Sequence, residues 1–362
     1  MQIYSASKQW ATRPEDERFN SLAEMYEATK RYASESKTAT VRWTDLRVEH
    51  SQDENLRIVG KAGVPAVLTN YAFGQIAARV GAPASYLRQL PATLAAQNLN
   101  HGLKGKVDGA DASLLFHKNG DLVLRAATTD EYSRIWNYEV IARLQDVSSR
   151  HGLIPGQQTF SWSGDKFVPS DTDRKALYAS DHDMFAFLMS QDATILDPTG
   201  KTLRRGIITV NSEVGDKSLS VMGFYFRDVC CNHIIWGAEQ IAEVRMTHRG
   251  DIRGRWLDAQ VEIRKYLNTA ASLDEAQLRK LTVRIGGTKE EVLDRLFGIK
   301  SIGLTYKALA ASYDAVNPDE DGDPKSVYGF AQGVTRYSQQ TPYADERTSL
   351  DRAAGRIMDF AF

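Results

Sequence analysis

Strand-like segments grouped ahead of helical ones are the feature that most constrains the fold of this chain. Four short segments rich in β-branched and aromatic residues lie within residues 176–236: ALYAS, MFAFLMS, RGIITVNS and SLSVMGFYFRDVCC. Gly215 and Asp216 predict a turn between the last two. Helical patterns then cover residues 237–271, 273–297 and 328–362. Because strands and helices are segregated, we predict an α+β fold, an antiparallel sheet of hairpins with flanking helices.

A second strand pair and a helical hairpin are predicted earlier in the chain. In DASLLFHKNGDLVLRAA, two apolar runs flank Asn119 and Gly120, the residue pair that most readily forms a tight hairpin turn. Within residues 68–103, apolar residues recur at helical spacing, which predicts two or three short helices. The segment 75–90 is similar to a helix-turn-helix, although the same spacing packs any helical hairpin. DNA contact by this segment is therefore kept as an alternative to plain packing.

The distribution of apolar clusters predicts the domain organisation. Residues 1–65 are polar, with scattered charges and one candidate strand, so we expect an N-terminal extension there. Residues 66–310 carry most of the predicted strands and helices and form the predicted α+β core domain. Residues 311–362 are predicted to be a C-terminal helical segment packed on that core. A chain of 362 residues is long enough to bury a substantial core.

Composition excludes several classes of protein. The net charge is only -1, so the chain as a whole has no electrostatic preference for nucleic acid or membranes. The two cysteines, Cys230 and Cys231, are adjacent, which argues against a disulfide framework and against zinc sites built on paired cysteines. The N-terminal residues do not resemble a signal peptide, and no run of about 18 apolar residues occurs. We expect a cytoplasmic protein without a membrane partner.

Charge is nevertheless segregated along the chain. Residues 245–265 contain six Lys or Arg against three Asp or Glu, a local charge of +3, whereas residues 310–362 carry a local charge of -4. Arginines beside aromatic side chains suit phosphate contact and base stacking. The alternative is a solvated helix face with ordinary ion pairs. The residues predicted to bind nucleic acid are Arg204, Arg205, Arg227, Arg245, Arg249, Arg253, Arg255, Tyr225 and Trp256.

A second cluster is rich in carboxylates. Asp181 and Asp183 flank His182 between two predicted strands, and Glu213 lies in a turn that could approach them. Carboxylates gathered in this way can hold magnesium or manganese for phosphoryl transfer. Acidic residues also cap turns beside strands, and we favour that structural role. The sequence contains no phosphate-binding loop, dinucleotide fingerprint or zinc-protease motif, so we expect no cofactor.

The order of the segments is similar to one known family. The chain resembles the phage/plasmid-like protein family known as domain of unknown function 932, from about residue 68 to the C-terminus. The most specific part of the resemblance is the series Asn211, Ser212, Glu213, Gly215, Arg227, Cys230 and Asn232. Where the family tends to have Cys-Asn-Gly, this chain has Cys231, Asn232 and His233. The resemblance implies a context of mobile DNA, and the host cytoplasm if a phage encodes the protein, but it supplies no chemistry.

Three functions therefore remain open. Our main expectation is a non-enzymatic protein that binds nucleic acid, preferably single-stranded DNA, in replication or recombination and acts as a homo-oligomer. The first alternative is a metal-dependent enzyme acting on phosphodiesters through the carboxylate cluster. The second alternative is a non-catalytic protein that modulates a protein partner.

Overall fold

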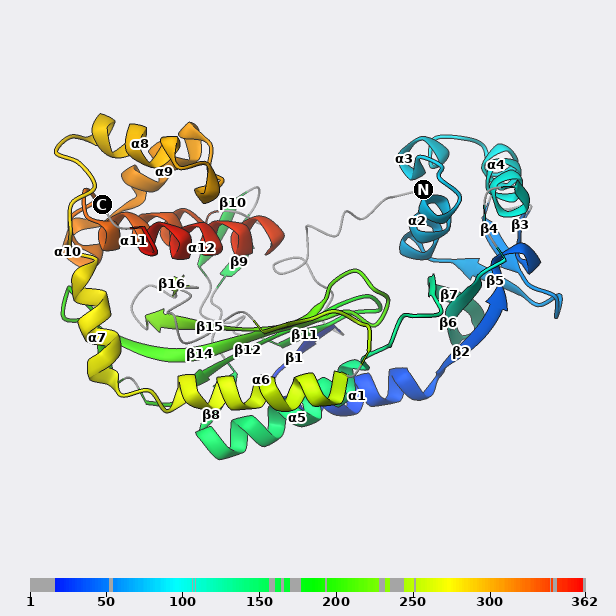
Figure 1. The fold of residues 1–362 in the computed structure, drawn as a ribbon, viewed down its shortest axis with the longest axis horizontal. Helices are drawn as coiled ribbons and strands as arrows, with labels where there is room; N and C mark the ends of the chain where they lie inside the picture. The colour runs from blue at the N-terminus through cyan, green and yellow to red at the C-terminus, as the bar shows by residue number, and fades with distance from the viewer. Residues whose placement is uncertain are drawn as a thin grey trace.

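The computed structural model describes residues 17–360, apart from 52–54, 106, 108, 156–159, 164–165, 170–176, 193, 228–231, 235–243, 251, 339 and 341–343. Figure 1 shows a smaller N-terminal lobe, residues 36–129, beside a larger body built on a long twisted sheet. The C-terminal helices rise from the far end of that sheet, so the N-terminal lobe and the C-terminal helices form opposite arms of the molecule (Figure 1).

The larger body is organised by an antiparallel sheet, here called the central sheet. Its main path runs β1-β11-β12-β14-β15-β16, while β8 pairs with β12, β13 with β14 and β17 with β15. The strands are β1 Arg18–Phe19, β8 Leu153–Pro155, β11 Leu177–Ala179, β12 Met184–Ser190, β13 Ile195–Leu196, β14 Thr202–Asn211, β15 Leu219–Arg227, β16 Asn232–Ile234 and β17 Val244–Met246. A separate hairpin joins β9 Phe160–Ser163 to β10 Lys166–Pro169. The predicted strand segments of residues 176–236 are thus confirmed as β11, β12, β14 and β15.

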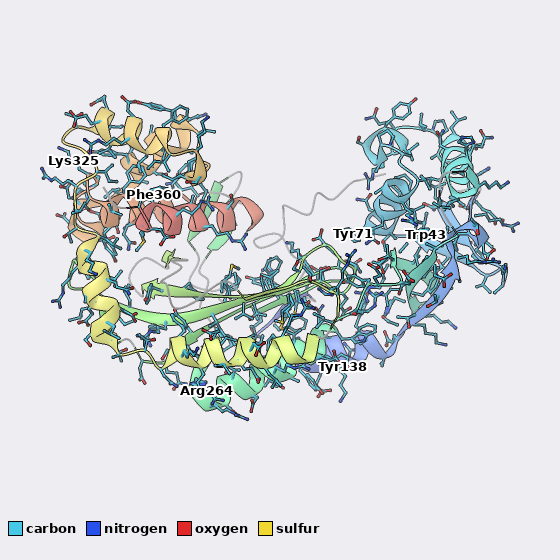
Figure 2. All side chains as sticks on the ribbon, viewed as in Figure 1. Trp43, Tyr71, Tyr138, Arg264, Lys325 and Phe360 are labelled. Atoms are coloured by element: carbon cyan, nitrogen blue, oxygen red, sulfur yellow. The ribbon has the colours of Figure 1, made fainter. Side chains whose placement is uncertain are left out.

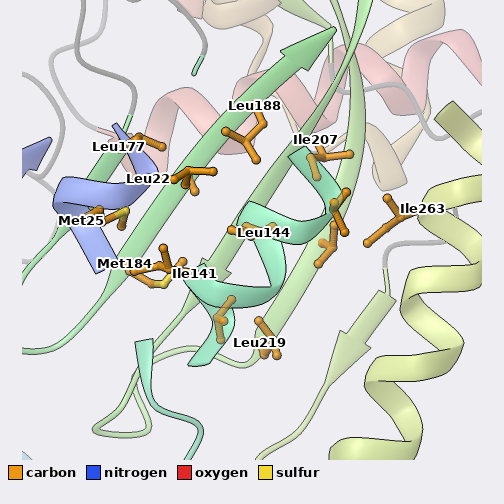
Figure 3. Close-up of a cluster of buried hydrophobic side chains, with 14 of the residues drawn as sticks. Leu22, Met25, Ile141, Leu144, Leu177, Met184, Leu188, Ile207, Leu219 and Ile263 are labelled. Carbon is orange, nitrogen blue, oxygen red and sulfur yellow. The ribbon is translucent and has the colours of Figure 1, made fainter. Parts of the chain in front are cut away.

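Side chains alternate between the two faces of the central sheet, and both faces are buried along β12. Its even-numbered residues, such as Met184 and Leu188, join a core with helices α1 Leu22–Ser34, α5 Asn137–His151 and α6 Ile252–Leu267. Figure 3 shows Leu144 of α5 and Ile263 of α6 directed at the strands of this face, here called the lower face. Burial on both faces explains why β12 reads as a continuous apolar run.

The opposite, upper face carries an aromatic cluster. Phe185, Phe187 and Phe224 lie there with Ile208 and neighbouring apolar residues. At the far end, strand residues such as Tyr225 pack with the C-terminal helices into one further core. These helices are α7 Ala271–Lys280, α8 Lys289–Gly298, the 3-10 turn η3 Lys300–Ile302, α9 Tyr306–Ala315, α10 Pro318–Asp321, α11 Val327–Ser338 and α12 Ala344–Met358.

The N-terminal lobe has its own sheet and core. The strand order is β2-β6-β7-β5-β4-β3, with only β5 and β7 parallel. The strands are β2 Ser36–Arg42, β3 Arg47–His50, β4 Leu56–Val59, β5 Pro65–Leu68, β6 Asp111–Asn119 and β7 Asp121–Thr129, with a 3-10 turn η2 Trp43–Asp45. Helices α2 Asn70–Arg79 and α4 Ala92–Gly105 pack on this sheet, and the short α3 spans Ala84–Leu87.

The predicted hairpin and the predicted short helices, which are α2, α3 and α4, are both confirmed in this lobe. Strands β6 and β7 form the expected hairpin, in which Asn119 pairs with Asp121 and Gly120 adopts a positive φ of 75°. Gly81, with φ of 70°, reverses the chain after α2. Helix α3 has only four residues, and its Leu87 is buried in the lobe core. The segment 75–90 therefore has a packing role and lacks a recognition helix of useful length.

The predicted domain boundaries differ from the structure. The segment 1–65 was expected to be an extension, but its described residues form α1 and strands β2 to β4, and Trp43 is buried in the lobe core. Its polar character reflects strands with one solvated face, such as β2, where exposed and half-buried residues alternate. The boundary expected at 65 and 66 falls inside β5, and the one at 310 and 311 falls inside α9.

Candidate functional site

A cavity of about 810 Å³ opens on the upper face of the central sheet, and we call it the groove. Phe185, Val210 and Ser220 form its floor, whereas its walls come from the turn between β14 and β15, the segment after β17, and α12. The lining residues are Tyr132, Phe185, Val210, Gly215, Asp216, Lys217, Ser218, Ser220, Thr247, His248, Arg249, Ser349, Arg352 and Arg356. Segments more than 200 residues apart in the sequence thus build one site.

Positive charge dominates the lining of the groove. Among its described lining residues, four are cationic, namely Lys217, Arg249, Arg352 and Arg356, and one carries a carboxylate, Asp216. Arg352 and Arg356 lie one turn apart on α12, where like charges disfavour each other. Burial and the charge of Arg352 lower the pKa of Arg356. An anion in the groove would relieve this repulsion.

Each of the two α12 arginines is held by a contact at its guanidinium. Arg352 Nη2 lies 3.2 Å from Met222 Sδ on the upper face. Arg356 Nη2 donates to the carbonyl oxygen of Ile302 at 2.7 Å. Both side chains are half-buried, so the helix presents them at fixed positions beside the cavity. A guanidinium has five N–H donors, so an arginine can hold a protein group and bind an anion at the same time.

The other two cations form ion pairs of different strength. Lys217 Nζ lies 3.5 Å from the buried Asp183 carboxylate and 4.4 Å from the centre of the Phe185 ring. Arg249 is 68% exposed and its partner Glu131 66% exposed, at 3.5 Å. An exposed ion pair contributes little free energy, so the pair with Glu131 does not prevent Arg249 from binding an anion.

Two stacked rings form one wall of the groove. The rings of Tyr132 and His248 are 4.8 Å apart and nearly parallel, at 5°. The Tyr132 hydroxyl donates to the carbonyl oxygen of Ser212 at 3.0 Å. His248 is only 6% exposed, and burial, with a smaller effect of the Arg134 charge, lowers its pKa to about 4. Its imidazole is therefore neutral at pH 7.

The turn after β14 carries the most specific part of the family resemblance, and its first residues have structural roles. Asn211 Nδ2 donates to the Ile135 carbonyl oxygen at 3.0 Å and to Asn137 Oδ1 at 2.8 Å. Ser212 Oγ donates to the His182 carbonyl oxygen at 2.6 Å and accepts from the Asp216 amide at 3.0 Å. These bonds fix the turn that presents Lys217 to the groove.

Glu213 joins the two lobes. One oxygen accepts from Arg125 Nη2 at 2.9 Å, and the other accepts from the Asn137 amide, the first of α5, at 2.9 Å. Arg125 belongs to β7, and both side chains are almost fully buried, at 1% and 2% exposure. Glu213 thus serves as a helix cap and as half of an ion pair.

The three carboxylates that the sequence analysis considered as metal ligands form hydrogen bonds or ion pairs with other residues of the protein. Glu213 is held by Arg125, and Asp183 accepts from Ser180 Oγ at 2.7 Å and pairs with Lys217. Asp181 is half-exposed and accepts from His182 Nδ1 at 2.7 Å. Among the residues that the structure describes, no three His, Cys, Asp or Glu side chains come together in a way that could hold a metal ion.

Two of the predicted nucleic-acid contacts lie at the groove or support it. Arg249 lines the groove directly. Arg255 donates to the Thr247 carbonyl oxygen at 3.0 Å and also to the carbonyl oxygen of Arg249, so it braces the segment that carries Arg249. Arg204 lies elsewhere, where its guanidinium contacts the carbonyl oxygens of Ser190 and Gln191.

Three other predicted contacts are buried and cannot reach a ligand at the surface. Arg205 forms an ion pair with Asp274 of α7, with both side chains under 10% exposed. Tyr225 packs against Tyr266, with ring centres 6.5 Å apart, and Trp256 belongs to the lower core. The sequence pattern suggested that these residues were accessible. In the fold they are buried, because they pack with partners far away in the sequence.

The remaining predicted arginines are placed by their backbones only. Arg227 is the last residue of β15, Arg245 lies in β17, and Arg253 follows the first residue of α6. Their side chains lie outside the described part, as do Cys230 and Cys231. Arg245, Arg249 and Arg253 thus do not share one helix, because Gly250, with φ of 70°, separates the strand from α6.

Arg352 and Arg356 were missed because they belong to the acidic C-terminal region. The net charge of -4 over residues 310–362 directed attention away from two arginines that are four residues apart within a helical pattern. That spacing is the signal that would have found them. Lys217 was overlooked because a single lysine beside a turn has no distinguishing pattern.

Comparison with known proteins identifies a family. The family model described as Domain of unknown function (DUF932) matches residues 132–354, more than half of the chain. The chain therefore belongs to this family, as the sequence resemblance indicated, but the match begins at residue 132 rather than near residue 68. No curated protein and no solved structure matches the chain. None of the described helices is long and apolar enough to cross a membrane.

Proposed function

We propose that this member of the DUF932 family binds single-stranded nucleic acid in the groove. One observation carries the proposal: among the described residues that line one cavity, four cationic side chains from three distant segments stand against one carboxylate. Lys and Arg that neutralise phosphates release condensed counterions, and this release supplies most of the affinity for a nucleic-acid backbone. A concave site walled by low-dielectric protein also concentrates the positive potential.

The geometry of α12 supports phosphate as the recognised group. Arg352 and Arg356 project from the same face of the helix, and guanidinium groups bind phosphate oxygens through paired N–H donors. Arg249 lies across the same cavity on the segment after β17. A chain of phosphodiesters can contact several such cations in succession, whereas a single monoanion cannot.

The dimensions of the groove support a single strand rather than a duplex. Its volume falls within the range of about 300 to 1,000 Å³ that is typical of pockets for small ligands. A few nucleotides of a single strand can enter such a space. A duplex is too wide to enter it, because its phosphates lie on a convex outer surface. The neutral His248 and its stacked partner Tyr132 provide a flat, uncharged wall beside the cations.

Fluorescence anisotropy with a labelled 20-nucleotide single strand, titrated with salt, tests the proposal. The variant Arg249→Gln with Arg352→Gln removes two groove cations. At about -0.7 per contact, the slope of log affinity against log salt should flatten by about 1.4, which is roughly a 25-fold loss at 0.1 M salt relative to 1 M. The matched control, Arg47→Gln with Arg279→Gln, removes two exposed cations outside the groove.

The outcome is read from the difference between the two variants. The proposal requires that the control variant bind as the parent does and that the groove variant, with an unchanged melting temperature, bind more weakly. Equal losses in both variants would indicate nonspecific attraction. Absence of binding by the parent at about 50 mM salt would refute the proposal.

The same proposal includes the biological setting. We infer that the protein acts on replicating or recombining DNA of a mobile element, and that it does so as a homo-oligomer. Light scattering of the free protein and of its complex with the 20-nucleotide strand measures the mass directly. A monomer in both states would remove the oligomeric part of the proposal and leave the groove as the binding site.

A further inference from the structure

Gln75 of α2 connects the N-terminal lobe to the turn that borders the groove. Its Nε2 donates to the carbonyl oxygen of Val214 at 2.8 Å, and its Oε1 accepts from the Ala127 amide at 2.8 Å. Ala127 lies in β7 of the lobe, whereas Val214 lies in the turn between β14 and β15. One side-chain amide thus satisfies a backbone donor of one lobe and a backbone acceptor of the other.

The contact between the lobe and this turn is close. Val214 is fully buried against Leu115 and Ala126 of the lobe sheet, with Tyr71 packed beside them. Figure 2 places Tyr71 at the base of the lobe, next to the central sheet. Gly215 follows with φ of 91°, a conformation that favours glycine. A side chain there would also lie 3.7 Å from Gln75 Nε2.

The residues after Gly215 reach the groove. Asp216 and Lys217 line it, and Lys217 is one of its four cations. The position of Lys217 therefore depends on a turn that is fastened on one side to the central sheet, through Ser212, and on the other side to the lobe, through Gln75. The ion pair of Arg125 with Glu213 is a second tie between the same lobe and the same turn.

We propose that Gln75 is a positioning residue for the groove: by holding the Val214 carbonyl, it makes the N-terminal lobe set the place of Lys217 beside the bound phosphate. This inference rests on the proposed function. The lobe lies wholly outside the family match, which begins at residue 132. The binding surface of the family domain is thus adjusted by a lobe that precedes it in the chain.

The substitution Gln75→Glu cuts this tie selectively. The carboxylate still accepts from the Ala127 amide but has no proton to donate to the Val214 carbonyl oxygen, and two acceptors then face each other. If Lys217 loses its place, the groove loses one phosphate contact. The slope of log affinity against log salt should be flatter by about 0.7. This corresponds to an affinity for the 20-nucleotide strand about fivefold lower at 0.1 M salt relative to 1 M.

Gln97→Glu is the matched control, since it makes the same change at an exposed position on α4 of the same lobe. A double-mutant cycle then separates positioning from general destabilisation. The second background is Lys217→Gln with Asp183→Asn, which removes the cation without leaving its buried partner charged. In that background Gln75→Glu should cost no further affinity, because the contact it acts through is already absent.

A measurement on the parent protein makes the inference independent of how well the variant folds. The exchange of the Ala127 amide hydrogen should slow when the strand binds, because an occupied groove holds the turn and, through Gln75, the lobe. Binding by the parent with unchanged exchange at Ala127, or additive losses in the cycle, would overturn the inference and leave the proposed function intact. If the parent does not bind at all, the proposed function itself fails.

Discussion

His248 shows how a single buried side chain contributes both to the wall of the groove and to a pH-dependent stability. The ring is stacked on Tyr132 and has lost most of its contact with water, and this burial lowers its pKa from 6.5 to about 4. A histidine with a lower pKa in the folded state takes up a proton more readily when the protein unfolds. The contribution of the neutral His248 to stability is therefore fully present above pH 6.5 and is lost as the pH falls towards 4.

The expected loss from His248 between pH 7.5 and pH 5 is about 2 kcal/mol of unfolding free energy. The variant His248→Phe keeps a ring on Tyr132 and should remove that part of the pH dependence. Urea denaturation at both pH values measures it, with His101→Phe at an exposed position of α4 as the control. A pH dependence equal in the parent and in His248→Phe would contradict the burial of a neutral imidazole.

Element packing in the N-terminal lobe depends on a close approach at α4. A Cβ atom at Gly102 would lie 2.4 Å from Val80 Cβ, so the helix touches the end of α2 with no room for a side chain. Gly105, in the last turn of the same helix, has open space around it. Comparing an alanine substitution at each glycine therefore distinguishes the effect of packing from the effect of helix propensity within one helix.

We expect Gly102→Ala to lower the unfolding free energy by about 1 to 3 kcal/mol, because overpacking outweighs the gain of about 1 kcal/mol in helix propensity. Gly105→Ala lacks the clash and should leave stability unchanged or raise it slightly. Thermal melts of both variants provide the comparison. The packing of α4 against Val80 is disproved if Gly102→Ala is as stable as Gly105→Ala.

Elements with a strong local pattern were predictable from the sequence. The hairpin of β6 and β7 was found because alternating apolar residues flank Asn119 and Gly120, and β12 was found because its apolar run is continuous. The candidate strand of residues 38–43 is confirmed as β2, but its place in a sheet could not be predicted, because its pairing partner β6 lies about 70 to 80 residues further along. Local periodicity does not contain that information.

At the scale of the whole molecule, the groove could be predicted only in part. Arg249 was identified from a local excess of positive charge, but the groove exists because the sheet brings that segment to α12 and to the turn after β14. The same long-range packing buries Arg205 against Asp274, which its spacing did not reveal. The family itself was recognised correctly, and the role of Asn211 in holding the turn became visible only with its partners in place.

The two lobes have separate cores, and the described contacts that join them include both buried polar pairs and the apolar packing of Val214. The N-terminal lobe is built around Trp43, and the larger body around the central sheet. Figure 2 shows Trp43 within the N-terminal lobe and Phe360 among the C-terminal helices, far across the molecule. The buried ion pair of Arg125 and Glu213 crosses between the lobes, where removal of one partner leaves an uncompensated charge.

We expect Arg125→Met to lower the unfolding free energy by about 3 to 5 kcal/mol and to separate the melting of the two lobes. Glu213→Gln alone should also destabilise, yet the double variant should lose less than the sum, because no buried charge then remains. Hydrogen exchange followed in the lobe around Trp43 and in the central sheet resolves the two transitions. If Arg125→Met unfolds in one transition with additive losses, the lobes are joined mainly by the apolar packing around Val214, and the ion pair adds little to their cooperation.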